Sequence, residues 1–184
     1  EVISMLKILY SVFYLVKKVL EKGAKEYTKS KFARIGDKVY IGDNCIFTPN
    51  SIEIGDHVFI GSNAVFQSAH GRIIIGNHVM FGPGVHIHGG NHNMDRLGVY
   101  MIEVHDKRPG EDGQVIIGED CWIGACAIIL KGVKIGQGSI IGAGSIVTKD
   151  VPPYTIYSGV PSCKIKPRWD EKTITEHENL LRER

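Results

Sequence analysis

Large apolar residues recur every six positions along most of this chain, and a glycine commonly follows each one. The series consists of Ile35, Ile41, Phe47, Ile54, Ile60, Phe66, Ile75, Phe81, Ile87, Ile117, Ile123, Ile129, Ile135, Ile141 and Val147. A step of six does not keep side chains on one side of an α-helix, which requires intervals of three and four. The β-branched content of the series also favours strands. The pattern therefore predicts many short β-strands separated by turns.

Three such units, eighteen residues, are enough for one coil of a three-sided prism. The apolar side chains would point into its axis, and the glycine, aspartate and asparagine residues that follow them let the chain turn at each corner. Successive coils would pair in parallel about 4.8 Å apart and bury their inner faces against one another. We expect an all-β solenoid, a parallel β-helix of about five coils, in residues 31–160. The spacing alone does not determine its handedness.

The two ends of the chain lack this series. Residues 1–30 contain a predicted helix that is apolar over much of its circumference from residue 3 to residue 20, with Lys7, Lys17 and Lys18 at its margins. One role for this helix is to cap the open first coil, and the alternative is peripheral contact of residues 1–22 with an anionic membrane surface. Residues 161–184 are predicted to form a tail and a short, solvated C-terminal helix in which no chemistry is recognised.

One long interruption separates Ile87 from Ile117, thirty residues where six would suffice. Its polar and charged side chains cannot belong to the prism interior, so we predict a loop insertion at residues 91–114. Long loops inside compact domains are usually functional or disordered. The interruption therefore marks the first place to look for chemistry.

Composition narrows the class of protein. The chain has 184 residues, 43% of them apolar, and a net charge of +2, which suits one ordinary domain and gives no reason to expect nucleic acid as a partner. Cys45, Cys121, Cys126 and Cys163 have neither metal-ligand spacing nor disulfide-scaffold density, so free thiols are expected. No signal peptide is visible, and the longest apolar run, 8–16, is too short to span a bilayer. We expect a cytoplasmic protein, or one held peripherally at the inner face of the membrane.

The most specific segment is CWIGACAIILKGVKIGQGSIIGAGSIVTKDVPPYTIYSGVPSCKIKPR, residues 121–168. It resembles the acetyl-coenzyme A-binding half of the hexapeptide-repeat acetyltransferases that act on galactosides, maltose and polysaccharides, and the resemblance extends over about residues 30–168. The family implies a left-handed β-helix, an exception to the right-handed crossover rule. It also implies a homotrimer with active sites between subunits, acetyl-CoA as co-substrate and no required metal.

Histidines cluster in the first half of the solenoid. His57 and His78 occupy the same slot on successive coils and should stack as outward neighbours, with Asp120 next in the column; such a column is either a metal site or a solvated ladder. His86 and His88 flank an inward isoleucine and therefore face outward. Acyl transfer to a hydroxyl needs a base, and histidine, with a free pKa of about 6.5, suits that role.

The resemblance assigns that base to His92, because Asn91 and His92 match the position of the catalytic histidine in the sugar acetyltransferases. Asp95 and Glu103 are alternative acids for orienting its ring. Backbone N–H groups of the segment 124–125 are the family-based donors for the negative charge that develops on the thioester oxygen.

The resemblance also implies the acetyl-CoA contacts. Gly124, Ala125 and Ala143 supply the main chain along a groove, Thr148 and Lys149 follow at its far end, and Trp122 either walls the groove or packs on the prism. Lys164, Lys166 and Arg168 are near the expected position of the phosphates, unless they form a merely solvated basic tail. Ser162 and Cys163 replace the basic residue that the family has here, so the sequence leaves the nucleotide's cation open.

The acceptor side of the pattern matches less closely. His70 is near the position of an acid, and Ser62 and Asn63 near that of an amide, that hold the sugar in related enzymes. A sugar or glycan acceptor, as in surface-polysaccharide O-acetylation, is the preferred interpretation.

Three rivals remain. The first is a xenobiotic acetyltransferase acting on streptogramin-type antibiotics, whose loops also carry an Asn-His pair. The second is a metal-dependent carbonic anhydrase on the same prism, although His86, His88 and His92 lack its spacing. The third is a non-catalytic solenoid, which the long loop disfavours.

Overall fold

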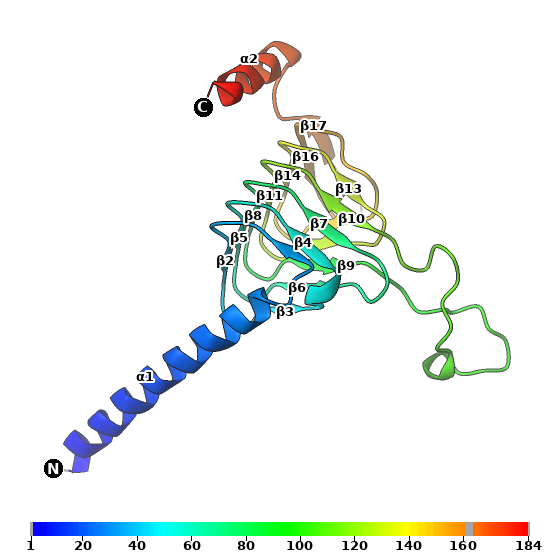
Figure 1. Cartoon of the computed structure of the whole chain (residues 1–184). Coiled ribbons are helices and arrows are strands. Elements are labelled where there is room, and N and C mark those ends of the chain that lie inside the picture. The colour runs from blue at the N-terminus through cyan, green and yellow to red at the C-terminus, as the bar shows by residue number, and fades with distance from the viewer. Residues whose placement is uncertain (1, 161–163, 184) are drawn as a thin grey trace.

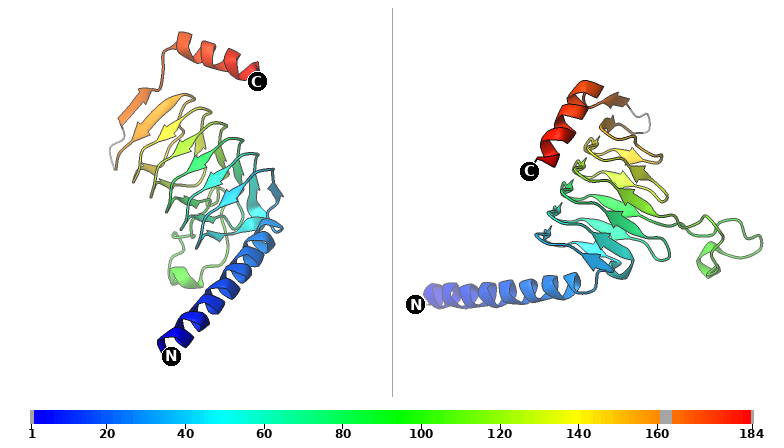
Figure 2. Two further views of the ribbon diagram at one scale, coloured as in Figure 1. Left: turned by 90° about the vertical axis from the view of Figure 1, so that its left-hand side faces the viewer. Right: turned by 45° about the horizontal axis from the view of Figure 1, so that its top comes forward.

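The fold is known from a computed structural model that describes residues 2–160 and 164–183. A three-sided column of short strands carries a long helix at its N-terminal end, a loop that projects from its side and a second helix at its C-terminal end (Figures 1 and 2). The helices are α1 (Val2–Lys29) and α2 (Glu171–Arg182), and two short 3-10 helices span Pro49–Ser51 and Met101–Glu103.

Three sheets form the sides of the column. The first contains β1 (Arg34–Ile35), β4 (Ile52–Ile54), β7 (Ile73–Ile75), β10 (Val115–Ile117) and β13 (Lys134–Ile135). The second contains β2 (Tyr40–Ile41), β5 (Phe59–Ile60), β8 (Met80–Phe81), β11 (Trp122–Ile123), β14 (Ile140–Ile141), β16 (Thr155–Ser158) and β17 (Lys164–Pro167). The third contains β3 (Ile46–Phe47), β6 (Val65–Gln67), β9 (His86–His88), β12 (Ile128–Ile129) and β15 (Ile146–Val147). Paired strands run parallel except β16 and β17, which are antiparallel.

The six-residue series forms the axis of the column. All its members are buried except Ile35 and Phe47, which are partly buried against the same core. The Phe66 ring lies between those of Phe47, which it meets edge to face, and Phe81, to which it is tilted, with ring centroids 5.5 and 5.1 Å away. The predicted inward side chains and parallel strands are therefore confirmed. Burial of such side chains, about 1.5–3 kcal/mol each, is the main force that holds the coils together.

The corner between the first and second sheets carries the predicted histidine column. Lys38, His57, His78 and Asp120 all have positive φ there. The rings of His57 and His78 stack with centroids 5.0 Å apart, as the sequence predicts. Among the described residues, no group of three or more His, Cys, Asp or Glu side chains is placed to hold a metal ion. Of the four cysteines, Cys45, Cys121 and Cys126 are free thiols, and Cys163 lies outside the described residues.

The N-terminal helix, predicted as one possible cap of the first coil, contacts that coil only near its C-terminal end. α1 extends nine residues beyond the predicted end of the helix, and only its last turns approach the first coil, where Lys25 forms an ion pair with Asp43. From Val2 to Leu20 the helix contacts no coil, and none of its residues is buried (Figure 2). Within this chain the outer part of the helix covers no coil, and a capping role for it stays a prediction. No helix in the described ranges is long and apolar enough to cross a membrane.

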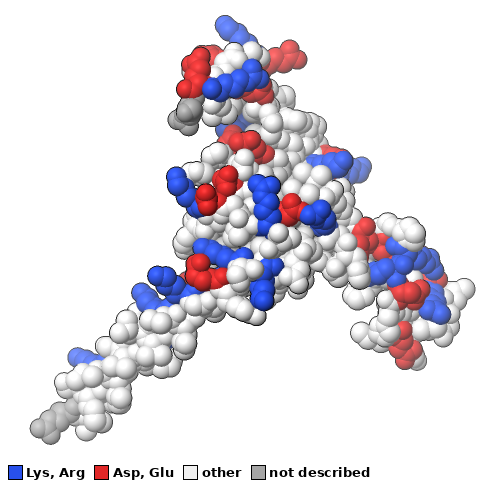
Figure 3. Space-filling model, in the orientation of Figure 1, with Lys and Arg blue, Asp and Glu red and all other residues white. Residues whose placement is uncertain are grey.

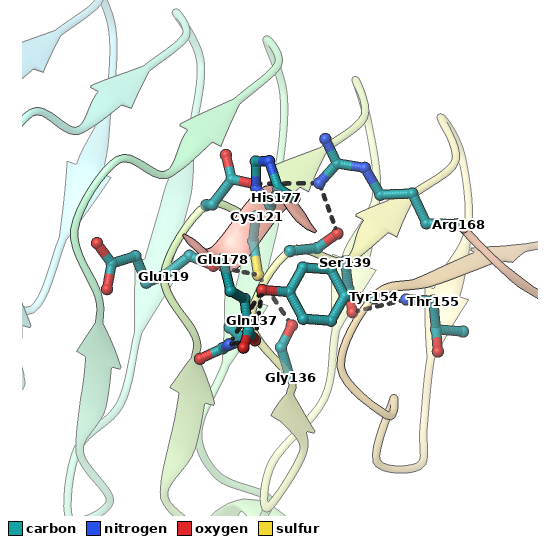
Figure 4. Close-up of polar contacts among 12 residues, drawn as sticks. Glu119, Cys121, Gly136, Gln137, Ser139, Tyr154, Thr155, Arg168, His177 and Glu178 are labelled. Atoms are coloured by element: carbon teal, nitrogen blue, oxygen red, sulfur yellow. Dashed lines mark hydrogen bonds and ion pairs between the residues drawn. The ribbon is translucent and has the colours of Figure 1, made fainter. Parts of the chain in front are cut away.

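The sequence predicts a solvated C-terminal helix, but the structure shows that this helix also contacts the column. Asp170 caps α2 by accepting a hydrogen bond of 2.8 Å from the N–H of Thr173. Glu178 accepts hydrogen bonds from the Tyr154 hydroxyl (3.0 Å) and the Gln137 amide (3.1 Å), as Figure 4 shows. The helix is therefore fastened to the last coils by specific polar contacts.

Candidate active site

The predicted loop leaves the column through a narrow neck. The chain departs at Gly89 and returns at Gly113, whose N–H donates to the Gly89 carbonyl at 2.9 Å. Asn91 N–H donates to the Glu111 carbonyl, also at 2.9 Å, and the Asn91 carbonyl accepts from Lys107 Nζ. These contacts fix the backbone immediately before residue 92 on both sides.

His92 follows this neck and is exposed. Its ring makes no hydrogen bond or ion pair with any residue in 2–160 or 164–183. Because neither ring nitrogen is occupied, the imidazole is free to accept a proton from a bound molecule. The neighbouring Asn93, in contrast, is buried. The exposed His92 therefore lies between two residues whose positions are fixed, Asn91 and Asn93.

The acids predicted to orient His92 have other positions. Asp95 forms an ion pair of 2.8 Å with Arg108, and the next residue, Arg96, pairs with Asp106 at 3.0 Å. These pairs join the outgoing and returning branches of the loop. Glu103 lies in the exposed short helix at residues 101–103. In this chain, then, neither acid contacts His92, and Asp95 serves the loop itself.

The sequence interpretation missed the residues that hold the neck. Lys107 Nζ lies 3.0 Å from Asp112 Oδ1, and the Asp112 side chain is only 10% exposed. A Cβ on Gly90 would lie 1.9 Å from that same oxygen, so a larger residue at position 90 would displace the Asp112 side chain where the two branches meet. A Gly-Gly pair opposite an Asp-Gly pair is the one sequence signal for such a neck, and it is weak.

The backbone donors predicted at residues 124 and 125 differ from each other. Gly124 N–H donates to the Ile141 carbonyl at 2.8 Å, so it belongs to the strand ladder and cannot also serve a ligand. Ala125 N–H has no acceptor among the described residues. The proposed pair of donors is thus reduced to one.

The reason is the residue one coil later. At equivalent corner positions, the N–H of Asp43 donates to Ser62 Oγ (3.1 Å), that of Asp37 to Asp56 Oδ1 (2.7 Å) and that of Asp56 to Asn77 Oδ1 (2.9 Å). The residue above Ala125 is Ala143, which has no side-chain oxygen to offer. A partly exposed N–H without a partner remains available to a bound molecule.

The third sheet connects the two groups of predicted acetyl-CoA contacts. Ala125 and Ala143 precede β12 and β15, whereas Thr148 and Lys149 follow β15 and are exposed. His92 also leaves the column at the edge where β9 ends. Within one chain, His92 and Ala125 therefore lie at opposite edges of this sheet.

His86 and His88 lie on the outer face of this sheet, as predicted, with ring centroids 5.7 Å apart. Burial, reinforced by the neighbouring His86, lowers the pKa of His88 below its usual range. Its surroundings therefore disfavour the charged form of the His88 ring.

The aromatic and basic candidates separate into two groups. Trp122 lies on the second sheet with its side chain exposed, above Met80 and below Ile140. Lys166 is exposed on β17, where it pairs with Ile156. Lys164 begins the same strand, and Ser162 lies outside the described residues.

Arg168 is already engaged. Its Nη1 donates to Asp120 Oδ2 at 3.1 Å and to the Gly138 carbonyl at 2.9 Å, and Figure 4 shows the Arg168 side chain making these polar contacts. Its guanidinium lies 4.0 Å from the centroid of the Trp169 ring. These contacts hold it at the corner between the first and second sheets. These contacts give Arg168 a structural role, and its assignment to the phosphates stays a prediction.

The predicted acceptor residues do not converge in one chain. Ser62 Oγ accepts from the Asp43 N–H, and Asn63 occupies the next, exposed corner position with φ of 61°. His70 is exposed on the connection between β6 and β7. These residues lie on the coil below His92, and His70 is separated from Ser62 and Asn63 by the length of β6.

Comparison with known proteins supports the fold described above. The family model described as bacterial transferase hexapeptide (six repeats) matches residues 114–149, and that of the hexapeptide repeat of succinyl-transferase matches residues 33–65 and 51–69. A hexapeptide-repeat-containing acetyltransferase of Vibrio cholerae O1 biovar eltor, solved in complex with acetyl coenzyme A, superposes with a TM-score of 0.70 at 30% identity, covering 80% of this chain and 79% of that one. This chain belongs to the hexapeptide-repeat acetyltransferases. Its three parallel sheets and N-terminal helix fit the left-handed β-helix of that family.

Two curated hexapeptide-repeat relatives differ in their substrates. The galactoside O-acetyltransferase of Lactococcus lactis subsp. lactis (strain IL1403) is 36% identical over 107 residues, covering 58% of this chain and 48% of the relative. The probable macrolide acetyltransferase of Lysinibacillus sphaericus is 37% identical over 116 residues, covering 56% of this chain and 64% of the relative. This chain thus spans about half the length of the first relative and less than two thirds of the second.

Proposed function

We propose that this protein transfers the acetyl group of acetyl-CoA to a hydroxyl of a sugar or glycan, with His92 as the general base. The observation that carries the proposal is the unengaged His92 ring on a fixed neck, in a chain whose family includes a solved acetyl-CoA complex. Direct transfer in a ternary complex needs only one base and one oxyanion donor.

The step is an acyl substitution. His92 removes the hydroxyl proton as the acceptor oxygen attacks the thioester carbonyl, and negative charge develops on the carbonyl oxygen. Ala125 N–H donates to that oxygen, because no protein group competes for it. The C–S bond then breaks, and the protonated His92 returns its proton to the sulfur, which leaves an acetyl ester and the free thiol of coenzyme A.

Acetyl-CoA would lie along the outer face of the third sheet. The main chain at Ala143, then Thr148 and Lys149, would contact its arm, and Lys166, whose side chain is exposed on β17, would pair with its phosphates. Since His92 and Ala125 lie at opposite edges of the third sheet, the complete site needs two copies of the chain. A homotrimer with three such shared sites satisfies this requirement.

The preferred acceptor is a sugar, which the galactoside relative supports. The probable macrolide acetyltransferase gives specific support to a xenobiotic hydroxyl as the second candidate. Ser62, Asn63 and His70 contribute to the acceptor side only if a neighbouring subunit brings them near His92.

The test is acetyl-CoA turnover by the wild type and by His92→Ala, with galactosides, sugar nucleotides and macrolides as acceptors. Loss of the base should lower kcat by about 10² to 10⁴, the usual contribution of general acid–base catalysis. His105→Ala is the matched control, because His105 is an exposed histidine of the same loop and should leave turnover unchanged. Wild-type turnover in His92→Ala with every acceptor would refute the proposal.

A further inference from the structure

The outer part of α1 is an apolar surface with no partner in the chain. Between Val2 and Leu20 its large apolar side chains are 47–71% exposed. Contiguous exposed apolar surfaces of this kind mark sites of interaction with a membrane or another protein. Figure 3 shows this part of the helix as a largely uncharged rod that stands away from the column.

The helix nevertheless has a polar side. Ser4, Ser11, Lys18 and Lys25 follow one another at intervals of seven residues, nearly two full turns, so they form one stripe. Leu9 and Val16 come two residues before Ser11 and Lys18, and two residues rotate the helix by about 200°. The centre of the apolar face is therefore almost opposite the polar stripe.

The contacts of the stripe set its direction relative to the column. Lys25, its last member, pairs with Asp43 of the first coil, so the stripe is turned toward the column and the apolar face away from it. A flat surface could thus bury the apolar face of α1 while the column stayed on the other side, in water.

The charge of this segment identifies the surface. Residues 2–20 contain Lys7, Lys17 and Lys18 but no Asp or Glu. Lys17 comes one residue after Val16 and is therefore rotated by about 100° from it, at the margin of the apolar face. Lys18, on the polar stripe, has its Nζ 4.8 Å from the centroid of the Tyr14 ring. Basic and aromatic residues at the edge of an apolar stripe are typical of helices that lie in the interface of an anionic bilayer.

We propose that α1 lies in the surface of an anionic lipid bilayer through the face centred on Leu9 and Val16, and holds the β-helix above it. The helix does not cross the bilayer. This location is independent of the acetyl transfer proposed above. It would place the enzyme where acceptors attached to lipid are present.

Flotation of the full-length protein with phosphatidylcholine vesicles, with and without phosphatidylglycerol, tests the proposal. The wild type should float with the anionic vesicles, and added salt should weaken the binding because the lysines contribute electrostatically. Leu9→Glu/Val16→Glu should reduce partitioning by at least about tenfold, since two charges would enter the apolar face.

Ser4→Glu/Ser11→Glu is the matched control, because it adds the same charge on the polar stripe and should retain most of the binding. Thermal unfolding and acetyl-CoA turnover in solution would show that both variants remain folded. A wild type that stays unbound with anionic vesicles overturns the proposal, and so does an equal loss of binding in the two double variants. The two double variants are also compared by light scattering in the absence of vesicles. If they differ in oligomeric mass there but bind vesicles equally, the apolar face joins copies of the chain and the lipid proposal is wrong.

Discussion

The corner at Ala125 shows how one missing side-chain oxygen creates a potential binding group. At three other corners of the column, a side-chain oxygen of the next coil accepts the N–H at this position, as Ser62 does for Asp43. Ala143 cannot do so, and the Ala125 N–H remains unpaired. One coil earlier the equivalent position is Pro83, which has no N–H at all and still fits the backbone.

This equivalence makes Ala125→Pro a test of the oxyanion donor that leaves the fold intact. Loss of the N–H should reduce kcat by about 10² to 10³, the usual effect of removing one oxyanion donor. Ala143→Pro is the matched control, which should chiefly raise the KM for acetyl-CoA. Steady-state kinetics and a thermal melt of each variant provide the measurement, and an unchanged kcat in Ala125→Pro would exclude the N–H from the reaction.

Residue-scale features were predictable where they repeat with the coil. The stacking of His57 on His78 follows from their shared slot and is confirmed. The difference between the paired Gly124 N–H and the unpaired Ala125 N–H was not predictable from the sequence. Gly124 donates to a carbonyl seventeen residues later, and only the folded strand ladder defines that pairing. The ion pair of Asp95 with Arg108 likewise depends on the path of the loop.

At the scale of elements, the basic residues of the C-terminal segment have two different roles, depending on whether they lie on β17 or in the connection between β17 and α2. Arg168 bridges Asp120 and Gly138 beside the Trp169 ring, whereas Lys166 is exposed on β17. The sequence places these two basic residues side by side and cannot separate them, because Asp120 is 48 residues away from Arg168.

Arg168→Gln should therefore destabilise the fold by about 1–2 kcal/mol, since a charge-assisted hydrogen bond and a ring contact are lost at a partly exposed site. Its KM for acetyl-CoA should not change. Lys166→Gln is the counterpart, for which a raised KM and an unchanged urea midpoint are expected. Urea titrations and kinetics of both variants distinguish the roles, and a raised KM in Arg168→Gln would return that residue to the phosphate site.

Helix boundaries at both ends also differ from the prediction. The apolar pattern ends at residue 20, yet α1 continues to Lys29 because good helix formers and the Lys25–Asp43 contact extend it. The contacts of Glu178 with Tyr154 and Gln137 could not be read from the sequence, which shows only that α2 is polar. Element length and docking thus depend on partners distant in the chain.

At the scale of the whole molecule, the proposed site requires two chains. The column itself was predictable, because each coil repeats a local pattern and contacts only its neighbours. The repeat in the sequence carries no signal for a site that two columns share.

Sharing can be tested by mixing two inactive variants. If one subunit provides His92 and another provides Ala125, then denaturing, mixing and refolding His92→Ala with Ala125→Pro should restore about a quarter of the wild-type rate, because that fraction of randomly formed interfaces contains both intact groups. Each variant refolded alone is the control. A mixture as inactive as its components would show that both groups act within one chain, and light scattering would report whether the assembly has the mass of three chains.

The antiparallel strand β17 has a consequence for the limits of the column. A parallel solenoid exposes unpaired N–H and C=O groups at each end, where another copy could add coil upon coil and produce a fibre. β17 occupies that edge of the second sheet and reverses the strand direction, so the register that a further parallel coil would need no longer exists there. Four residues of the chain thus block parallel addition at this edge of the second sheet.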